Sequence, residues 1–341
     1  MRKLYNICIV AMLLLSAISC KSFHSLGSKK SAQGSAYELL LVCNNSEWES
    51  PLGEALRTLF ATPVEVINQV EPKFDVLRIT ANNFTNILPA HRNILKVLCS
   101  PDVKECGVYA SYDVVSSPQI VLTFQGPTIE AMVEYLNKNG ESLLDVLEKA
   151  ERDRTIAVAY KNGAKTLESK IHELFGITIH LPQGYLLRSA SKDFLWASHE
   201  YPVASQGFFI YTSPYVGKQS LTTESLVKAR NVAAQNIPGP VDGSFMTTVS
   251  QIPNIEDNGY VAFVPDRREV LINGRPWIEL RGLWDVENYF MGGPFVSYTT
   301  LDEATGRLLT IDCYVYSPKD GKRNLLRQLE HLVYCVEMPE K

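Results

Sequence analysis

The sequence predicts an α+β protein in which antiparallel sheets, covered by helices, form two halves joined by a helical connector. Three observations support this prediction. Strand-like segments repeatedly face each other across turn signals, which is typical of hairpins and of antiparallel pairing. Each half ends with a hairpin, a proline and an amphipathic helix. A charge-dense helical stretch lies between them, so we place the halves at residues 37–150 and 151–341.

The N-terminal half begins with an apolar run of strand length, YELLLVCN. Ser50 and Pro51 then predict a helix start, because serine caps the helix and proline suits its first turn. KFDVLRIT alternates as a strand does, and GVYASYDVV and QIVLTFQG read as a hairpin around Ser-Ser-Pro. A helix follows Pro127 and should end at Gly140, and residues 141–175 should be helical with a break at Asn162.

The C-terminal half restarts with three strand-like segments, ITIHLPQGYLL, DFLWASHE and GFFIYTSPY. A helix is expected over residues 222–236. Asn273 and Gly274 lie between two β-type runs and give the strongest hairpin signal in the chain. A second hairpin should turn at residues 302–306, and an amphipathic helix over 318–333 should end the fold.

The N-terminus has the pattern of an export signal. Arg2 and Lys3 are followed by a mostly apolar stretch, residues 7–18, which is too short for the roughly 20 residues that span a bilayer. Ala17 and Ser19 supply the small residues before a cut at Cys20. Residues 1–19 therefore read as a signal peptide. An ordinary secretory cut at the same bond is the alternative.

This signal resembles that of bacterial lipoproteins, in which the cysteine becomes the first residue and is acylated. The resemblance implies a palmitate-type anchor on Cys20, which would make the membrane a partner of this protein. Ala17 departs from the usual leucine. Lys21 replaces the aspartate that often retains lipoproteins in the inner membrane, and no acidic stretch follows, so we expect the periplasmic face of the outer membrane. Residues 20–36 should form a flexible linker.

Composition argues against nucleic-acid binding. Removal of the signal leaves 31 basic and 37 acidic residues, a net charge of −6, so no basic excess exists to neutralise phosphates. Hydrophobic residues make up 45 % of the chain, which is enough for a substantial core.

The cysteines and histidines give no metal or cofactor signature. Cys99 and Cys106 flank a turn-like segment and could form a local disulfide in an oxidising compartment. Cys43 and Cys313 lie in apolar runs and are expected to be buried. No CxxC, HExxH or glycine-rich phosphate loop occurs in the sequence, so we predict neither a metal nor a cofactor.

One short motif matches serine acyl enzymes. Ser225 and Lys228 have the Ser-x-x-Lys spacing, in which a lysine can take the serine proton. The partner motifs Ser-Asp-Asn and Lys-Thr-Gly are absent, so we expect no catalytic role.

A cluster of cations and aromatic residues is a candidate anion or ligand pocket. It would combine strand residues with the start of the last helix, next to a turn at Gly292–Pro294. The alternative is a structural salt-bridge set that joins helix to sheet, with Glu330 as a partner and the tryptophans in the core. The candidate pocket residues are Arg281, Trp284, Lys322, Arg323 and Arg327.

Two segments carry a resemblance to a known family. RGLWDVENYFMGGPFVSYTTLD and YSPKDGKRNLLRQLEHLVY resemble a family of Bacteroidota lipoproteins catalogued as a domain of unknown function. This resemblance implies an envelope location and a lipid anchor but no activity. ITIHLPQGYLLRSASKDFLWASHE with GFFIYTSPY is similar, more loosely, to the PsbP-like fold, an antiparallel sheet covered by helices.

These observations predict a non-enzymatic envelope lipoprotein that binds another envelope protein or a cell-wall component. The alternative is a periplasmic hydrolase whose pocket lies near the MGGPF segment, residues 291–295.

Overall fold

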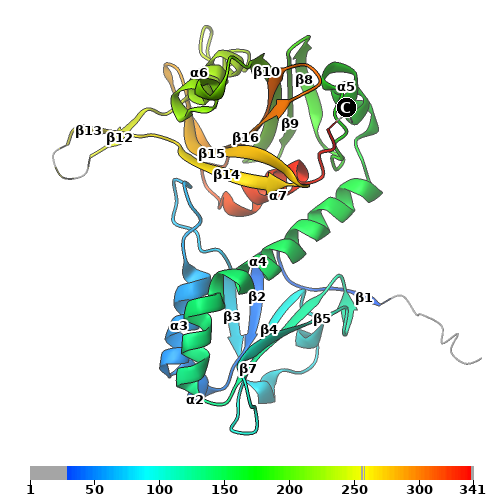
Figure 1. Cartoon of the computed structure of the whole chain (residues 1–341), viewed down its shortest axis with the longest axis vertical. Helices are drawn as coiled ribbons and strands as arrows, with labels where there is room; N and C mark the ends of the chain where they lie inside the picture. Colours follow the sequence, from blue (N-terminus) through cyan, green and yellow to red (C-terminus); the bar gives the residue numbers. More distant parts are fainter. Residues whose placement is uncertain (1–28, 255, 257, 339–341) are drawn as a thin grey trace, which may run out of the picture.

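The computed structural model describes residues 29–254, 256 and 258–338. The predicted signal peptide and Cys20 lie outside these residues. Two parts, each built around one main sheet, are connected by a long helix that crosses between them (Figure 1). The prediction of an α+β fold with mostly antiparallel sheets is confirmed. None of the helices in the described ranges combines the length and hydropathy that a membrane-spanning helix needs.

The N-terminal part contains a five-stranded sheet that is mainly parallel, in contrast to the antiparallel pairing expected from the hairpins. Its central strands are apolar runs buried on both faces, as parallel strands usually are. Helices α2 and α3 connect β2 to β3, whereas β4 is connected to β7 through β5 and β6. Only the predicted hairpin, β5 with β7, is antiparallel. In spatial order the strands are β3 (Asp75–Ile79), β2 (Glu38–Val42), β4 (Asn93–Cys99), β7 (Ile120–Gly126) and β5 (Gly107–Tyr112).

Helices α3 (Pro51–Ala61) and α4 (Ile129–Lys161) cover one face of this sheet. Ser50 caps α3 as predicted, since its Oγ accepts a hydrogen bond from the Leu52 N–H. The short helix α2 (Asn45–Trp48) precedes α3, and two 3₁₀ turns, η1 (Ala81–Asn83) and η2 (Leu88–Ala90), lie before β4.

Helix α4 continues through Gly140, so the prediction that this glycine ends the helix is wrong. A Cβ at Gly140 would lie 3.0 Å from Leu59 Cδ1, which means that α3 and α4 pack closely at this point. The glycine therefore serves helix packing rather than termination. The predicted break at Asn162 is confirmed, because α5 (Lys165–Phe175) begins three residues later.

The predicted linker is shorter than residues 20–36. Strand β1 (Lys30–Ser31) pairs in parallel with β6 (Ser116–Ser117), and Gln33 bridges to His91. The backbone of residues 30–33 is therefore tied to the N-terminal part. The earlier linker residues, 20–28, lie outside the described ranges.

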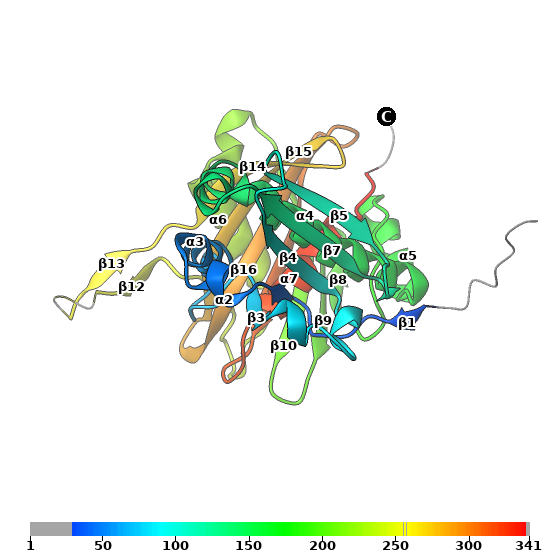
Figure 2. The same cartoon turned by 90° about the horizontal axis from the view of Figure 1, so that it is seen from below.

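The C-terminal part is a curled, fully antiparallel eight-stranded sheet (Figures 1 and 2). The first expected strand, ITIHLPQGYLL, is instead mostly irregular, and the sheet starts later, at β8. The spatial order is β11 (Met246–Thr248), β15 (Arg275–Val286), β16 (Tyr289–Asp302), β17 (Arg307–Tyr316), β10 (Ser205–Pro214), β9 (Phe194–Glu200) and β8 (Leu186–Ser191), with β14 (Asp266–Ile272) also paired to β15.

Helices cover both faces of the curled sheet. Helix α7 (Arg323–Val333) lies between the sheet and α4, whereas α6 (Thr223–Ala234), preceded by the 3₁₀ turn η3 (Lys218–Leu221), packs on the opposite face. The last helix, α7, starts five residues later than Pro318, the predicted start. The hairpin of β12 (Gln251–Pro253) and β13 (Tyr260–Ala262) extends away from the body (Figures 1 and 2).

Both predicted hairpin turns of the C-terminal part are confirmed. Asn273 and Gly274 have left-handed φ values of 51° and 75°, as a tight two-residue turn requires. In the second turn, the Gly306 N–H donates to the Asp302 carbonyl at 2.8 Å.

The glycine-rich segment 291–295 is not a turn, contrary to prediction. It lies inside β16, where Gly293 pairs with Trp284 of β15. A Cβ at Gly293 would lie 2.1 Å from the Val315 carbonyl oxygen, so a larger residue would clash with neighbouring backbone. The glycines permit this close approach of strands, and the alternative of a hydrolase pocket near this segment stays a prediction.

Candidate functional site

The structure places Arg281 and Arg327 in one buried salt-bridge network. Both terminal nitrogens of Arg281 lie 2.9 Å from the Glu330 carboxylate, and its Nε donates to Glu279 at 2.8 Å. Arg327 contacts the same Glu330 at 3.0 Å and Glu148 of α4 at 3.5 Å. The two arginines hold the pKa of Glu330 down at about 2 despite its burial.

Lys322 and Arg323 connect the start of α7 to the N-terminal part. Lys322 Nζ donates to Gln69 at 2.7 Å, and Arg323 donates to Asp75 and to the Pro72 carbonyl, both at 2.6 Å. Both cations are buried and have partners within the protein.

Trp284 lies on the opposite face of the sheet from Arg281. Its Nε1 donates to the Val315 carbonyl at 3.2 Å, and its ring packs against Tyr314 in the core under α6. The five predicted residues therefore do not form one pocket. Side chains along a strand alternate between the two faces of the sheet, and residues 281 and 284 are an odd number of positions apart. Arg281 and Trp284 therefore point to different faces.

The predicted cysteine sites are thiols in the structure. Cys43 and Cys313 are buried, and burial raises the pKa of each thiol. Cys99 and Cys106 are half-buried, and burial likewise raises their pKa. The disulfide between Cys99 and Cys106 stays a prediction. Within the described ranges no three His, Cys, Asp or Glu side chains lie close enough together to hold a metal ion.

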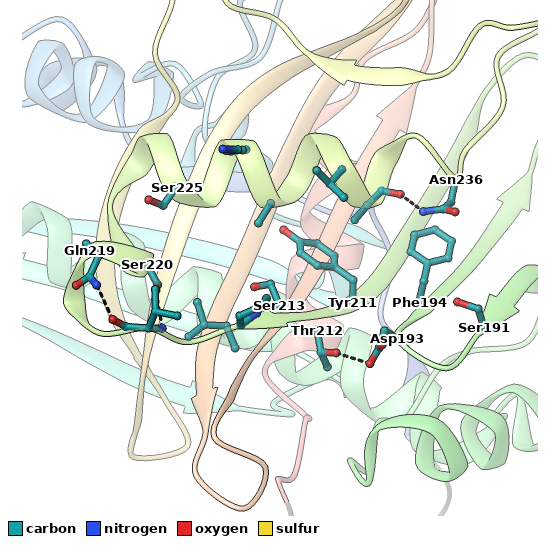
Figure 3. Close-up of a pocket in the computed structure, with 17 residues that line it drawn as sticks. Ser191, Asp193, Phe194, Tyr211, Thr212, Ser213, Gln219, Ser220, Ser225 and Asn236 are labelled. Carbon is teal, nitrogen blue, oxygen red and sulfur yellow. Dashed lines mark hydrogen bonds between the residues drawn. The ribbon is translucent and has the colours of Figure 1, made fainter.

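A cavity of about 640 Å³ lies between α6 and the curled sheet (Figure 3). Three elements form its walls: α6 with the loop before it, the tight turn between β8 and β9, and strand β10. Thr222 immediately precedes helix α6 and caps it, because its side chain accepts a hydrogen bond from the Ser225 N–H. Residues four apart on α6, such as Ser225 and Ala229, thus share the face that lines the cavity.

The floor of this cavity is apolar. Phe194 of β9, Tyr211 of β10 and Leu308 of β17 are all buried there and belong to the core under α6. Ala229 and Ala233 add small side chains from the helix, which leaves the space open. Burial raises the pKa of Tyr211 well above its usual value, so its hydroxyl stays protonated.

The rim of the cavity is polar and carries one cation without a counter-ion. Lys228 is exposed and has no hydrogen bond or salt bridge with any residue that the structure describes. The carboxylate of Asp193, on the other side of the cavity, already has two partners. It accepts a hydrogen bond from the Thr212 hydroxyl at 2.9 Å and forms a salt bridge with Arg307. The hydrogen bond from Thr212 and the arginine lower the pKa of Asp193.

The Ser-x-x-Lys pair found in the sequence, Ser225 and Lys228, lies at this cavity. The Ser225 hydroxyl is hydrogen-bonded to Thr222 Oγ1 at 3.0 Å, and among the described residues no hydrogen bond joins it to Lys228. A serine nucleophile needs a base within hydrogen-bond reach. Sequence reasoning found the Ser225–Lys228 pair but missed the cavity, because its lining comes from four segments that no local pattern connects.

Beneath the cavity, a buried ion pair fixes α6 to the sheet. Arg230 and Asp312 are fully buried, and Arg230 Nε donates to Asp312 Oδ2 at 2.9 Å. Arg230 also donates to Thr248 at 2.9 Å and lies 3.7 Å from the centre of the Phe295 ring. Burial raises the pKa of Asp312 to about 6, while Arg230 opposes this shift.

Comparisons with known proteins give two families of unknown function. No curated protein matches the chain. Among solved structures, a mutant of the protein Mog1 is similar over 48 % of this chain and 93 % of its own, with 10 % identity and a TM-score of 0.28. The human StarD13 (DLC2) lipid transfer and protein localization domain is similar over 50 % and 95 %, with 10 % identity and a TM-score of 0.23. Both TM-scores are too low to indicate a shared fold, and the PsbP-like arrangement stays a prediction.

The two family matches follow the two parts of the structure. Residues 32–160, which include the five-stranded sheet and α4, match a domain of unknown function, DUF8532. Residues 164–335, half of the chain and nearly all of the curled sheet with its helices, match another, DUF4837. The chain therefore belongs to the DUF4837 family of domains of unknown function.

Proposed function

We propose that this protein is a lipid-anchored envelope protein that binds a small amphipathic anion in the cavity under α6. The observation that carries the proposal is the pairing of an apolar floor with an uncompensated lysine at the rim. The envelope protein or cell-wall component expected from the sequence would bind the same folded protein. The lipid anchor would hold that protein at the periplasmic face of the outer membrane.

The size and polarity of the cavity support a ligand of this kind. Small-molecule sites usually have volumes of about 300 to 1,000 Å³ and apolar walls with a few polar groups that fix orientation. The cavity of about 640 Å³ lies within this range. Phe194 and Leu308 offer carbon surface to an apolar body, while Lys228 offers a positive charge to a carboxylate or sulfonate.

Replacing Lys228 with methionine should weaken the binding of such an anion about tenfold, because one charge-assisted contact of about 1.4 kcal/mol is lost. The apolar floor is unchanged in this variant. The probe is anilinonaphthalene sulfonate, whose fluorescence rises in an apolar site, and decanoate should displace it. Titrations of the wild type and Lys228→Met give the two dissociation constants.

Lys138→Met is the matched control, because Lys138 is also an exposed helical lysine but lies on α4 and pairs with Glu134. This variant should bind the probe as the wild type does. Equal affinity in Lys228→Met and the wild type, or failure of decanoate to compete, would show that the probe binds elsewhere and would refute the proposed site.

The anchor has a separate test. Cys20→Ala should move the protein from the membrane fraction to the soluble fraction, because the acyl chains have no other attachment point. Cell fractionation followed by immunoblotting measures this change. A variant that stays in the membrane fraction contradicts lipid attachment at Cys20 but leaves the proposal for the cavity untouched.

A further inference from the structure

A second cavity, of about 310 Å³, lies where the two parts of the molecule meet. Helix α4 and the residues just before β2 and β4 form one wall, and helix α7, the segment before β8, the end of β9 and the start of β10 form the other. Unlike the cavity under α6, it is lined mainly by planar polar and aromatic side chains. Both family domains contribute to it, so it exists only in the intact chain.

The N-terminal wall is a network of charged groups. Glu151 is buried and accepts from Arg92 at 2.6 Å and from Arg154 at 3.0 Å. Arg154 also donates to the Asn93 side chain at 2.8 Å and is thereby held in place. Arg92 Nε is buried and has no hydrogen-bond partner in the described part of the chain. This wall carries two positive charges against one negative charge.

The C-terminal wall contains an unsatisfied amide. Gln206 is only 2 % exposed, and its Nε2 donates to the Tyr185 hydroxyl at 2.8 Å. The other amide atom, Oε1, is buried without a partner among the described residues. Buried polar atoms are nearly always hydrogen-bonded in folded proteins, so this one points to a group that occupies the cavity.

Aromatic rings and further amides lie beside Gln206. The His199 and Tyr201 rings are stacked with centroids 4.5 Å apart, and Tyr185 packs edge-on against His199. From α7, Gln328 lines the cavity with no hydrogen bond to any described residue. Asn324 and His331 flank it one turn away on the same helix face.

We infer that this junction cavity binds a single sugar ring, and an acidic sugar in preference to a neutral one. Hydroxyl groups both donate and accept, so a sugar suits a lining that offers amide and guanidinium groups. Planar amides and guanidinium groups match pairs of adjacent hydroxyls or a carboxylate, and aromatic faces suit the C–H face of a sugar ring. The excess positive charge favours a carboxylated ring.

The neutral state of His331 supports this choice of ligand. Burial lowers the pKa of His331 to about 3, so the side chain adds no charge at neutral pH. The arginine and glutamate side chains of the described lining are Arg92, Arg154 and Glu151.

Saturation-transfer NMR with glucuronate and glucose at millimolar concentration tests this inference. Glucuronate should bind the purified protein about tenfold more tightly than glucose, which corresponds to one charge-assisted contact. Gln328→Leu should weaken both sugars at least about fivefold without changing the urea midpoint, because Gln328 has no hydrogen-bond partner to lose among the described residues. Gln206→Leu should also weaken binding.

The variants of the two cavities serve as controls for each other. Lys228→Met should bind glucuronate as the wild type does, and Gln328→Leu should bind anilinonaphthalene sulfonate as the wild type does. No saturation transfer to either sugar would overturn the inference, as would equal sugar binding by the wild type and Gln328→Leu. Neither result would affect the site under α6.

Discussion

Replacing Asp312 with alanine should lower the free energy of unfolding by about 3 to 5 kcal/mol, the range for removing one partner of a buried ion pair. Arg230 would keep its charge in a fully buried position with Thr248 as its main remaining hydrogen-bond partner. Its contact with the Phe295 ring, at 3.7 Å, does not replace a carboxylate. Urea unfolding followed by circular dichroism measures the loss.

The double variant Arg230→Met with Asp312→Leu is the control. Removing both charges and keeping the volume should restore much of the stability, because neither charge is then left buried alone. The single variant should also lose affinity for anilinonaphthalene sulfonate, since Arg230 holds the helix that carries Lys228. A loss below about 1 kcal/mol in Asp312→Ala would mean that water reaches this pair and that α6 is held by its apolar residues alone.

Acidification should destabilise the protein through His331. Burial lowers the pKa of this histidine from its ordinary 6.5 to about 3, so it stays neutral in the folded protein. The unfolded chain binds a proton near pH 6.5, and the folded chain does so only near pH 3. The neutral His331 therefore makes its full contribution to the free energy of unfolding above pH 6.5. This contribution is lost as the pH falls from 6.5 toward 3.

The surroundings of His331 explain why it resists protonation. Its Nε2 lies 3.0 Å from the Tyr37 hydroxyl, which donates to Glu148 at 2.9 Å, and its Nδ1 lies 3.1 Å from Thr155 Oγ1. Thr155 Oγ1 also lies 3.2 Å from the Glu151 carbonyl, to which it can donate. Burial is the main reason why the pKa of His331 is low, and the positive charges of Arg327 and Arg152 add to it. Glu330 favours a charge on His331, but its carboxylate is already shared by two arginines.

The expected loss amounts to about 4 to 5 kcal/mol between pH 7 and pH 3, with a slope of up to about 1.4 kcal/mol per pH unit. His331→Gln should remove this part of the pH dependence, because glutamine can replace the hydrogen bonds but does not titrate. Asp312 acts in the opposite direction between about pH 4 and 6, since its pKa is raised, but it does so equally in both proteins. The difference between the two stability curves thus isolates His331.

Urea midpoints measured in half-unit pH steps give both curves. Parallel curves for the wild type and His331→Gln would contradict the assignment of a neutral histidine at the junction. Hydrogen exchange at pH 5 should locate the effect, with faster exchange in α7, which carries His331, and in α4, which carries Thr155, than in the core of the curled sheet.

Local signals in the sequence located many of the helix starts and turns. Ser50 and Pro51 begin α3, and Asn273 with Gly274 makes a hairpin turn, because capping and left-handed φ values depend on the residue itself. Alternating and apolar runs likewise predicted β5, β7, β9 and β10. Each of these features is decided within a few residues.

Features that depend on distant neighbours were predicted less well. Gly140 was predicted to end a helix, but it lies within α4, where the missing side chain makes room for Leu59. Gly293 was predicted to lie in a turn, but it lies in a strand against the backbone of β17. The parallel order of β2, β3, β4 and β7 was also missed, since an apolar run does not reveal the direction of its partner.

The sequence by itself determined the α+β class, the hairpins of the curled sheet and the charged residues that required partners. Only the tertiary structure decided which partners they have: Glu330 joins Arg281 to Arg327, and Asp312 joins Arg230. It also decided that Lys228 lines a cavity with an apolar floor and has no counter-ion in the part of the chain that the structure describes. The physical reason is that helix caps and turns depend on neighbouring residues, whereas ion pairs and cavities arise between segments that only the packed chain brings together.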